Sequence, residues 1–333
     1  MSLAPELVQA AAILRTATWP TRVARLLRLV GLLAAVVLVS VVLTVGLPLS
    51  GQVILLAVLV AFVGMPHGGL DHLVGRVLCR PVFGRAWPIY FFSWYLAVAA
   101  LVVVGWLSAP IATMTLFFLL SALHFAQTER DHPLLAMLFG GMVIWMPMLA
   151  QPEAVACLLD WITPAAQAGD FRWAMDQAWP MLVMLAVLAG GVWSWRILTA
   201  LSQGRPQPLA ETLTQIGYAL LFAFAPVLVS FTVYFCARHS ARELRHLAEQ
   251  ANPSDPATGL RRVLRVAAPM SLGAVAMILA GAWLWHDGTA AEPAVVRAVF
   301  LGLSAVAVPH ILLHWLADSQ QVGPFTRLAE EGS

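Results

Sequence analysis

Long apolar runs separated by short polar segments make up most of the chain. An α-helix needs about 20 predominantly apolar residues to cross the hydrocarbon core of a bilayer, and most of the runs approach that length. The pattern predicts an all-α fold, a polytopic transmembrane helical bundle with about eight to ten spans. Outside the stretch 209–237, the predicted spans are 29–49, 52–66, 87–108, 111–127, 134–150, 178–195, 264–285 and 294–316.

The stretch 209–237 needs a separate interpretation. Arg205 precedes it and Arg238 follows it, and basic residues concentrate on the cytoplasmic side of a membrane. Both ends are therefore expected in the cytoplasm, which requires an even number of crossings. Pro226 lies near the middle and has no backbone N–H for a helix. We expect two helices broken at Pro226, either as short spans or as a re-entrant pair.

Composition and charge support a membrane protein and give its orientation. The chain is 60 % hydrophobic and 11 % charged, whereas soluble proteins average about 25 % charged residues. All 19 basic residues are arginine, and the predicted layout puts every one except Arg172 and Arg297 on the cytoplasmic face. We expect a cytoplasmic or interfacial segment at 1–28, a single transmembrane catalytic domain at 29–318, and a cytoplasmic tail at 319–333.

Ionisable residues occur where the predicted span 52–66 ends, in the segment 64–72, which reads GMPHGGLDH. Ionisable groups are costly in lipid and usually face a protein interior, a cavity or a partner. The glycines leave room for another helix or a ligand to approach the backbone. Other predicted spans also carry histidines near their cytoplasmic ends, and the full set is His67, His72, His124, His239, His310 and His314.

Several helices that deliver imidazoles to one depth predict a buried transition-metal site near the cytoplasmic ends of the helices. Imidazoles with a carboxylate and no thiolate favour iron over copper or zinc. Iron within a lipid environment implies a lipophilic substrate and dioxygen. The chain shows no phosphate-binding glycine loop, nucleophile elbow or basic-aromatic surface, so nucleotide chemistry, hydrolysis and nucleic-acid binding are disfavoured.

Helical spacing refines the candidate residues. Two pairs are four residues apart and would share a helix face: His239 and Glu243, and His310 and His314. His67 and Asp71 would do the same if the helix continues through Gly68 and Gly69. His67 and His124 lie deepest in the predicted spans and are favoured as ligands. His310, His314, Asp71 and His72 are candidates either for alternative ligands or for residues that orient the ligands through hydrogen bonds. For Asp71, a helix cap or an ion pair with Arg76 also stays open.

Four motifs taken together resemble the Brp/Blh family of bacterial and archaeal β-carotene 15,15′-dioxygenases, which are all-helical membrane enzymes that make retinal. They are PHGGLDH at 66–72, SALHF at 121–125, YFCARHSAR at 234–242 and PH at 309–310. The resemblance implies Fe(II) bound by His67, His124 and His239. It also implies β-carotene or a related carotenoid and O2 as substrates, a bacterial plasma (inner) membrane location with both termini cytoplasmic, and a functional link to a microbial rhodopsin.

The chain departs from the family pattern at the expected fourth ligand. The family motif resembles HSxRH, whereas this chain reads HSARE, with Glu243 at the fourth ligand position. Either Glu243 binds iron as a carboxylate, or His310 supplies the fourth nitrogen. Phe125, Tyr234 and Phe235 flank ligands in the sequence and are expected to line the path of the polyene.

Three other functions remain open from the sequence. A histidine-box di-iron desaturase or hydroxylase needs HxxxH and HxxHH clusters, but HxxxH occurs once, at 310–314, and HxxHH does not occur. A haem-b electron carrier would use two facing histidines. A family member that does not cleave carotene, such as an opsin-related membrane factor, would fit the departure at Glu243.

Overall fold

The computed structural model describes residues 46–127, 132–163, 169–203, 206–284 and 291–319, and these residues form helices and short connections without a strand. The first half contains α3 (Leu49–Leu59), η1 (Val60–Gly64), α4 (Met65–Gly68), α5 (Asp71–Phe83), η2 (Gly84–Ala86), α6 (Trp87–Ser108), α7 (Pro110–Ala126), α8 (Pro133–Gly140), α9 (Met142–Ala150) and α10 (Pro152–Ile162). The second half contains α11 (Asp170–Ser202), α12 (Pro206–Phe224), α13 (Val227–Val233), η4 (Tyr234–Ser240), α14 (Ala241–Ala251), α15 (Pro256–Leu284) and α16 (Ala291–Ser319).

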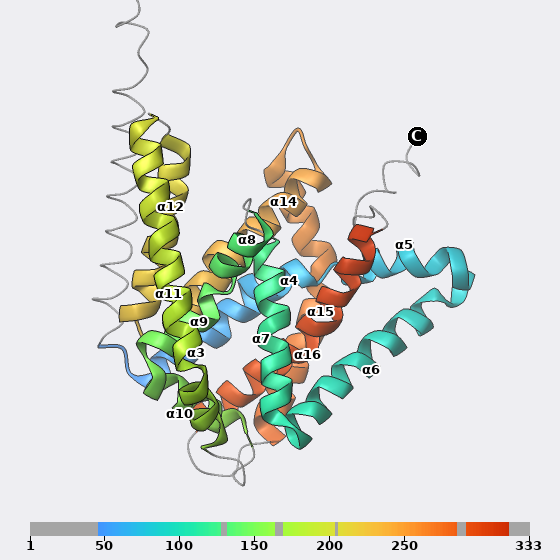
Figure 1. The fold of residues 1–333 in the computed structure, drawn as a ribbon. Helices are drawn as coiled ribbons and strands as arrows, with labels where there is room; N and C mark the ends of the chain where they lie inside the picture. The colour runs from blue at the N-terminus through green and yellow to red at the C-terminus, as the bar shows by residue number, and fades with distance from the viewer. Residues whose placement is uncertain (1–45, 128–131, 164–168, 204–205, 285–290, 320–333) are drawn as a thin grey trace, which may run out of the picture.

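The predicted all-helical membrane architecture is confirmed. Among the described residues, four apolar stretches are long enough to cross a membrane, or five if α8 and α9, which meet at a bend of 50°, form one span. One of the four, Leu49–Ser108, turns back between α5 and α6 at Gly84, whose φ of +53° suits a residue without a Cβ (Figure 1). The expected count of eight to ten spans is higher because it also included shorter helices. Most of the span predicted at 29–49 lies outside the described residues, as do the segments 1–28 and 320–333.

The long helices α6, α11, α12, α15 and α16 define the two edges and the middle of the bundle. In Figure 1, α11 and α12 lie side by side at one edge, and α6 lies at the opposite edge. Between them, α16 packs against both α6 and α15. Many large apolar side chains on α6, α11 and α15 point outward, including Leu101, Val187 and Leu279. Such an apolar exterior is the surface expected of helices that face lipid.

The predicted break at Pro226 is confirmed, because α12 ends at Phe224 and α13 begins at Val227. Pro226 has no N–H to donate to the carbonyl four residues earlier, which belongs to Phe222. The side-chain amide of Gln151 instead donates to the carbonyls of Phe222 and Ala225, each at 2.8 Å. A polar side chain from the start of α10 therefore satisfies backbone groups that the proline leaves free, as required in an apolar environment.

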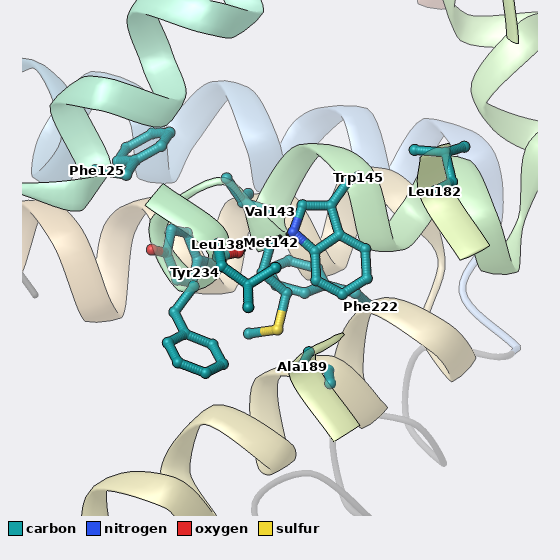
Figure 2. Packing of buried hydrophobic residues seen from close by; sticks show 11 residues of the cluster. Phe125, Leu138, Met142, Val143, Trp145, Leu182, Ala189, Phe222 and Tyr234 are labelled. Atoms are coloured by element: carbon teal, nitrogen blue, oxygen red, sulfur yellow. Dashed lines mark hydrogen bonds between the residues drawn. The ribbon is translucent and has the colours of Figure 1, made fainter. Parts of the chain in front are cut away.

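The largest aromatic core joins α7, α8, α9, α11, α12 and η4 (Figure 2). Phe139, Met142 and Phe222 are almost completely buried in it. Phe125 and Tyr234 lie in the same core, with ring centroids 5.7 Å apart (Figure 2). Phe125 immediately follows His124 on α7, and Tyr234 is the first residue of η4, which contains His239. The core therefore fixes both of the elements that carry these histidines.

Gly140 is expected to be essential for this packing. A Cβ at Gly140 would lie 2.5 Å from the backbone nitrogen of Ala126 and 2.7 Å from the carbonyl carbon of Phe125, and backbone atoms cannot move aside. We expect Gly140→Ala to lower the thermal transition of the purified protein by several degrees, consistent with about 1–3 kcal/mol of overpacking. Gly191→Ala on α11 is the control, because its Cβ would meet nothing within 4 Å. Equal transitions for the two variants would contradict this prediction.

Candidate metal centre

Three histidines from three different elements meet inside the bundle. They are His67 on α4, His124 in the last turn of α7, and His239 on η4. One ring nitrogen from each lies within 4.8 Å of the corresponding nitrogens of the other two. The ring of His239 has its centroid 5.2 Å from that of His67 and 4.8 Å from that of His124. The structure therefore brings together the three histidines that the sequence motifs singled out.

The spacing of the nitrogens suits a shared metal ion. Nε2 of His124 lies 3.1 Å from Nε2 of His239. Two imidazole nitrogens that are each about 2.1 Å from one ion, at tetrahedral to octahedral angles, lie about 3.0–3.4 Å apart. Within the described part of the chain, Nδ1 of both rings is buried without a hydrogen-bond partner. A hydrogen bond between the two Nε2 atoms would use one proton and one lone pair, whereas a metal ion would use both lone pairs.

Two π-helical segments position these ligands. His239 lies within η4, and η1 ends at Gly64, three residues before His67. The two segments contact each other. Nδ1 of His67 makes a short hydrogen bond with the carbonyl oxygen of Gly64. This bond fixes the ring and leaves Nε2 available to a metal ion. π-Helices are rare and are frequently found at functional sites, and the apolar pattern gave no indication of either one.

The glycines of the segment 64–72 allow close approach, as predicted. A Cβ at Gly64 would lie 2.6 Å from a ring carbon of Phe235, and one at Gly69 would lie 2.8 Å from both the Cβ and the carbonyl oxygen of Ala267. The helix carrying His67 is thus pressed against η4 on one side and α15 on the other. A larger residue at Gly69 would push the two helices apart, because it would meet the backbone of Ala267.

A second polar group adjoins the three histidines and is centred on Asp71. The buried Asp71 carboxylate accepts a hydrogen bond from Nδ1 of His310 at 2.8 Å and a longer one from Nε2 of His314 at 3.3 Å, both on Oδ1. Its Oδ2 accepts a hydrogen bond from the hydroxyl of Tyr95 at 2.9 Å. His72 points elsewhere, with Nδ1 bonded to the carbonyl of Gly69 at 3.0 Å.

Tyr95 was not among the candidate residues, because in the sequence it belongs to an aromatic cluster at the start of the span 87–108. Its hydroxyl also donates to the carbonyl of Val306 on α16 at 3.0 Å. The hydrogen bond between Tyr95 and the buried carboxylate of Asp71, 24 residues away, forms because α6 folds back against α5. A local sequence pattern does not predict such a contact.

Two residues from the sequence prediction lie away from the three histidines. Glu243 is half-buried in the first turn of α14 and belongs to neither of the two groups described above. It lies close enough to His314 for an electrostatic interaction. Tyr234 is buried in the aromatic core, packed against Phe125, Tyr218 and Phe222.

An apolar cavity of about 370 Å³ opens beside the histidines. Its polar wall includes His67, His124, His239 and His310. Phe125 and Phe235, two of the three aromatic residues predicted to line a substrate path, also face it. The remaining wall comes mainly from apolar residues of α6, α7, α9, α10, α15 and α16, among them Phe118, Met148, Leu158, Leu159, Ala274 and Phe300. A cavity with this lining suits a hydrocarbon ligand held against a small polar end.

Comparison with known proteins connects this arrangement to one family. The family model described as "Beta-carotene 15,15'-dioxygenase" matches residues 58–317, which include every histidine of the two polar groups. The chain belongs to this family. It is also 24 % identical over 274 residues to the "Beta-carotene 15,15'-dioxygenase" of an uncultured marine bacterium, 66A03, and the match covers 77 % of this chain and 90 % of that protein. No solved structure matches the chain.

The donor set fits the iron that the family resemblance implies. Three histidine nitrogens at the wall of an apolar cavity could hold a metal ion there. The described cysteines are Cys79, Cys157 and Cys236, and none belongs to either polar group. A nitrogen-rich site without thiolate suits iron among the metals that imidazole binds.

Proposed function

We propose that this protein is an iron-dependent dioxygenase that cleaves the central 15,15′ double bond of β-carotene with O2 to give two molecules of retinal. The observation that carries the proposal is the meeting of His67, His124 and His239 at the wall of an apolar cavity, in a chain of this family. The relative from the marine bacterium carries the same activity in its name.

The reaction balances without a net proton transfer, because one double bond and one O2 become two carbonyl groups. When bound, the iron would supply the activation of dioxygen. The protein then needs to hold the ligands rigidly, admit the polyene and exclude water. The apolar wall can perform the last two tasks, and Phe125 and Phe235 would place the polyene beside the histidines, since both rings contact His239 and face the cavity.

Expression in a bacterium that accumulates β-carotene tests the proposal. We expect orange colour to be lost and retinal to appear, with two retinal molecules formed per carotene consumed, and labelled O2 should deliver one oxygen atom to each product. Chelation of iron in the purified protein should stop the reaction, and added Fe(II) should restore it. Unchanged carotene alongside iron-loaded protein would instead support a family member that does not cleave carotene.

The same proposal includes the bacterial plasma membrane, with both termini cytoplasmic, and delivery of retinal to a microbial rhodopsin. The arginine distribution supports this orientation. We expect a fluorescent protein fused after Ser333 to fluoresce, and a periplasmic phosphatase reporter fused at the same residue to be inactive. The opposite result would reverse the proposed orientation.

A further inference from the structure

We propose that His310, held by Asp71, is the fourth protein ligand of the metal and that Glu243 is not a ligand. This inference depends on the metal centre of the proposed function, but it is independent of which substrate is cleaved. It concerns the position at which the chain departs from the family pattern.

The His310 ring lies about half an ångström farther from His124 and His67 than the His239 ring does. Its ring centroid is 5.4 Å from that of His124 and 5.7 Å from that of His67, compared with 4.8 and 5.2 Å for His239 against the same two rings. The His310 ring is nearly perpendicular to both, at 81° and 89°. The residue is 8 % exposed and faces the same cavity. His310 therefore adjoins two of the three histidines and faces the cavity that all four share.

The hydrogen bonds of His310 leave the correct nitrogen for a metal. Its Nδ1 donates to Asp71 at 2.8 Å, so Nε2 is the nitrogen with a free lone pair. Metal-binding histidines usually donate their other ring N–H to a carboxylate or a carbonyl, which fixes the tautomer and raises the basicity of the ligand. His67 follows the same rule through the carbonyl of Gly64.

Asp71 is itself fixed by partners from two other helices. Tyr95 on α6 donates to Oδ2, and His314 on α16 lies 3.3 Å from Oδ1. Tyr95 also bonds the carbonyl of Val306, one turn before His310 on α16. This network accounts for the buried carboxylate without a second ion, whereas His124 and His239 have only each other as hydrogen-bond partners among the described residues. The geometry therefore assigns Asp71 to positioning and His310 to ligation.

Glu243 lacks the corresponding features. It follows the π-helical segment in the first turn of α14 and belongs to neither polar group. It is also absent from the wall of the cavity that the four histidines share. Its electrostatic neighbour is His314, which bonds Oδ1 of Asp71 and is not one of the three clustered histidines.

Cobalt titration of the full-length protein in lipid nanodiscs tests the assignment, because Co(II) reports its ligands through its visible absorption. We expect one Co(II) per chain in the wild type. His310→Ala and His310→Gln should each raise the Kd by more than about 100-fold and change the absorption band, since loss of a ligand exceeds the 10–100-fold effect of losing a hydrogen-bond partner. Asp71→Asn should raise the Kd by about 10–100-fold. Glu243→Gln, the matched control, should retain the wild-type Kd and spectrum.

A rescue experiment separates ligation from a merely structural role. In His310→Gly, millimolar free imidazole should restore the wild-type Co(II) spectrum, which it would not do if His310 only supported the fold. The assignment is overturned if His310→Ala and His310→Gln both bind Co(II) like the wild type, or if Glu243→Gln loses the metal. It is also overturned if the wild type binds two Co(II) ions that both depend on Asp71. A chain that binds one Co(II) through His310 but leaves β-carotene intact when it is loaded with Fe(II) would refute the proposed function and keep this assignment.

Discussion

Replacing His124 with alanine is expected to remove nearly all bound iron and to lower retinal formation by more than about 100-fold, since even the loss of a residue that only orients a metal ligand costs 10–100-fold. Its Nε2 lies 3.1 Å from that of His239, and its ring forms part of the cavity wall. Iron per chain and retinal per chain should fall together, because the same side chain supports both.

His246→Ala is the matched control for this experiment. His246 is exposed on α14, and its ring nitrogen pairs with the amide of Gln250 at 3.0 Å on the same helix. We expect wild-type iron content and retinal formation from this variant. Wild-type iron content in His124→Ala would contradict the metal centre, and loss of iron from His246→Ala would show that the measurement responds to nonspecific damage.

Filling the cavity is expected to separate substrate binding from iron binding. Met270, Gly273, Ala274 and Met277 repeat along one face of α15 and line the cavity. Ala274→Phe would place a ring in the cavity where the polyene is expected and would leave all of the histidine side chains unchanged. We predict at least a tenfold lower rate of carotene cleavage with unchanged iron content, because a well-packed pocket accepts extra atoms only by excluding ligand or by strain, at about 1–3 kcal/mol.

Leu272→Phe provides the comparison, because Leu272 is 66 % exposed on α15 and does not line the cavity. Both variants should be assayed for retinal formation and for iron by elemental analysis. Equal cleavage by Ala274→Phe and the wild type would mean that the polyene does not use this cavity. Equal losses in both variants would indicate damage to α15 rather than a blocked site.

The features predicted well from the sequence depend on local patterns. Charge-free runs identified the helices, and Pro226 marked the break because proline removes a specific backbone donor. Histidines at similar depths in several spans favoured His67 and His124, because a bilayer sets a common depth scale for all its helices, and the family motifs added His239.

The features that sequence reasoning did not find depend on contacts between distant segments. Asp71 and His310 are 239 residues apart, and only the packing of α16 beside α5 and α6 brings them within hydrogen-bond distance. The π-helical geometry around His239 could not be predicted from the sequence either, because apolar periodicity does not distinguish a π-helix from an α-helix over so few residues. Spacing of four residues therefore suggested Glu243 as a partner of His239, whereas only tertiary packing reveals that the His310 ring lies 5.4 Å from that of His124 and 5.7 Å from that of His67.

The origin of these ligands in separate helices has a thermodynamic consequence. An ion that binds only the assembled bundle joins α4, α7, η4 and, by the assignment above, α16, so its binding free energy adds to the free energy of unfolding. At a free metal concentration 100 times the Kd, this linkage amounts to about 2.7 kcal/mol. The metal would then cross-link α4 and α16, which are far apart in the sequence. The thermal transition of the protein should therefore rise with the logarithm of the free metal concentration.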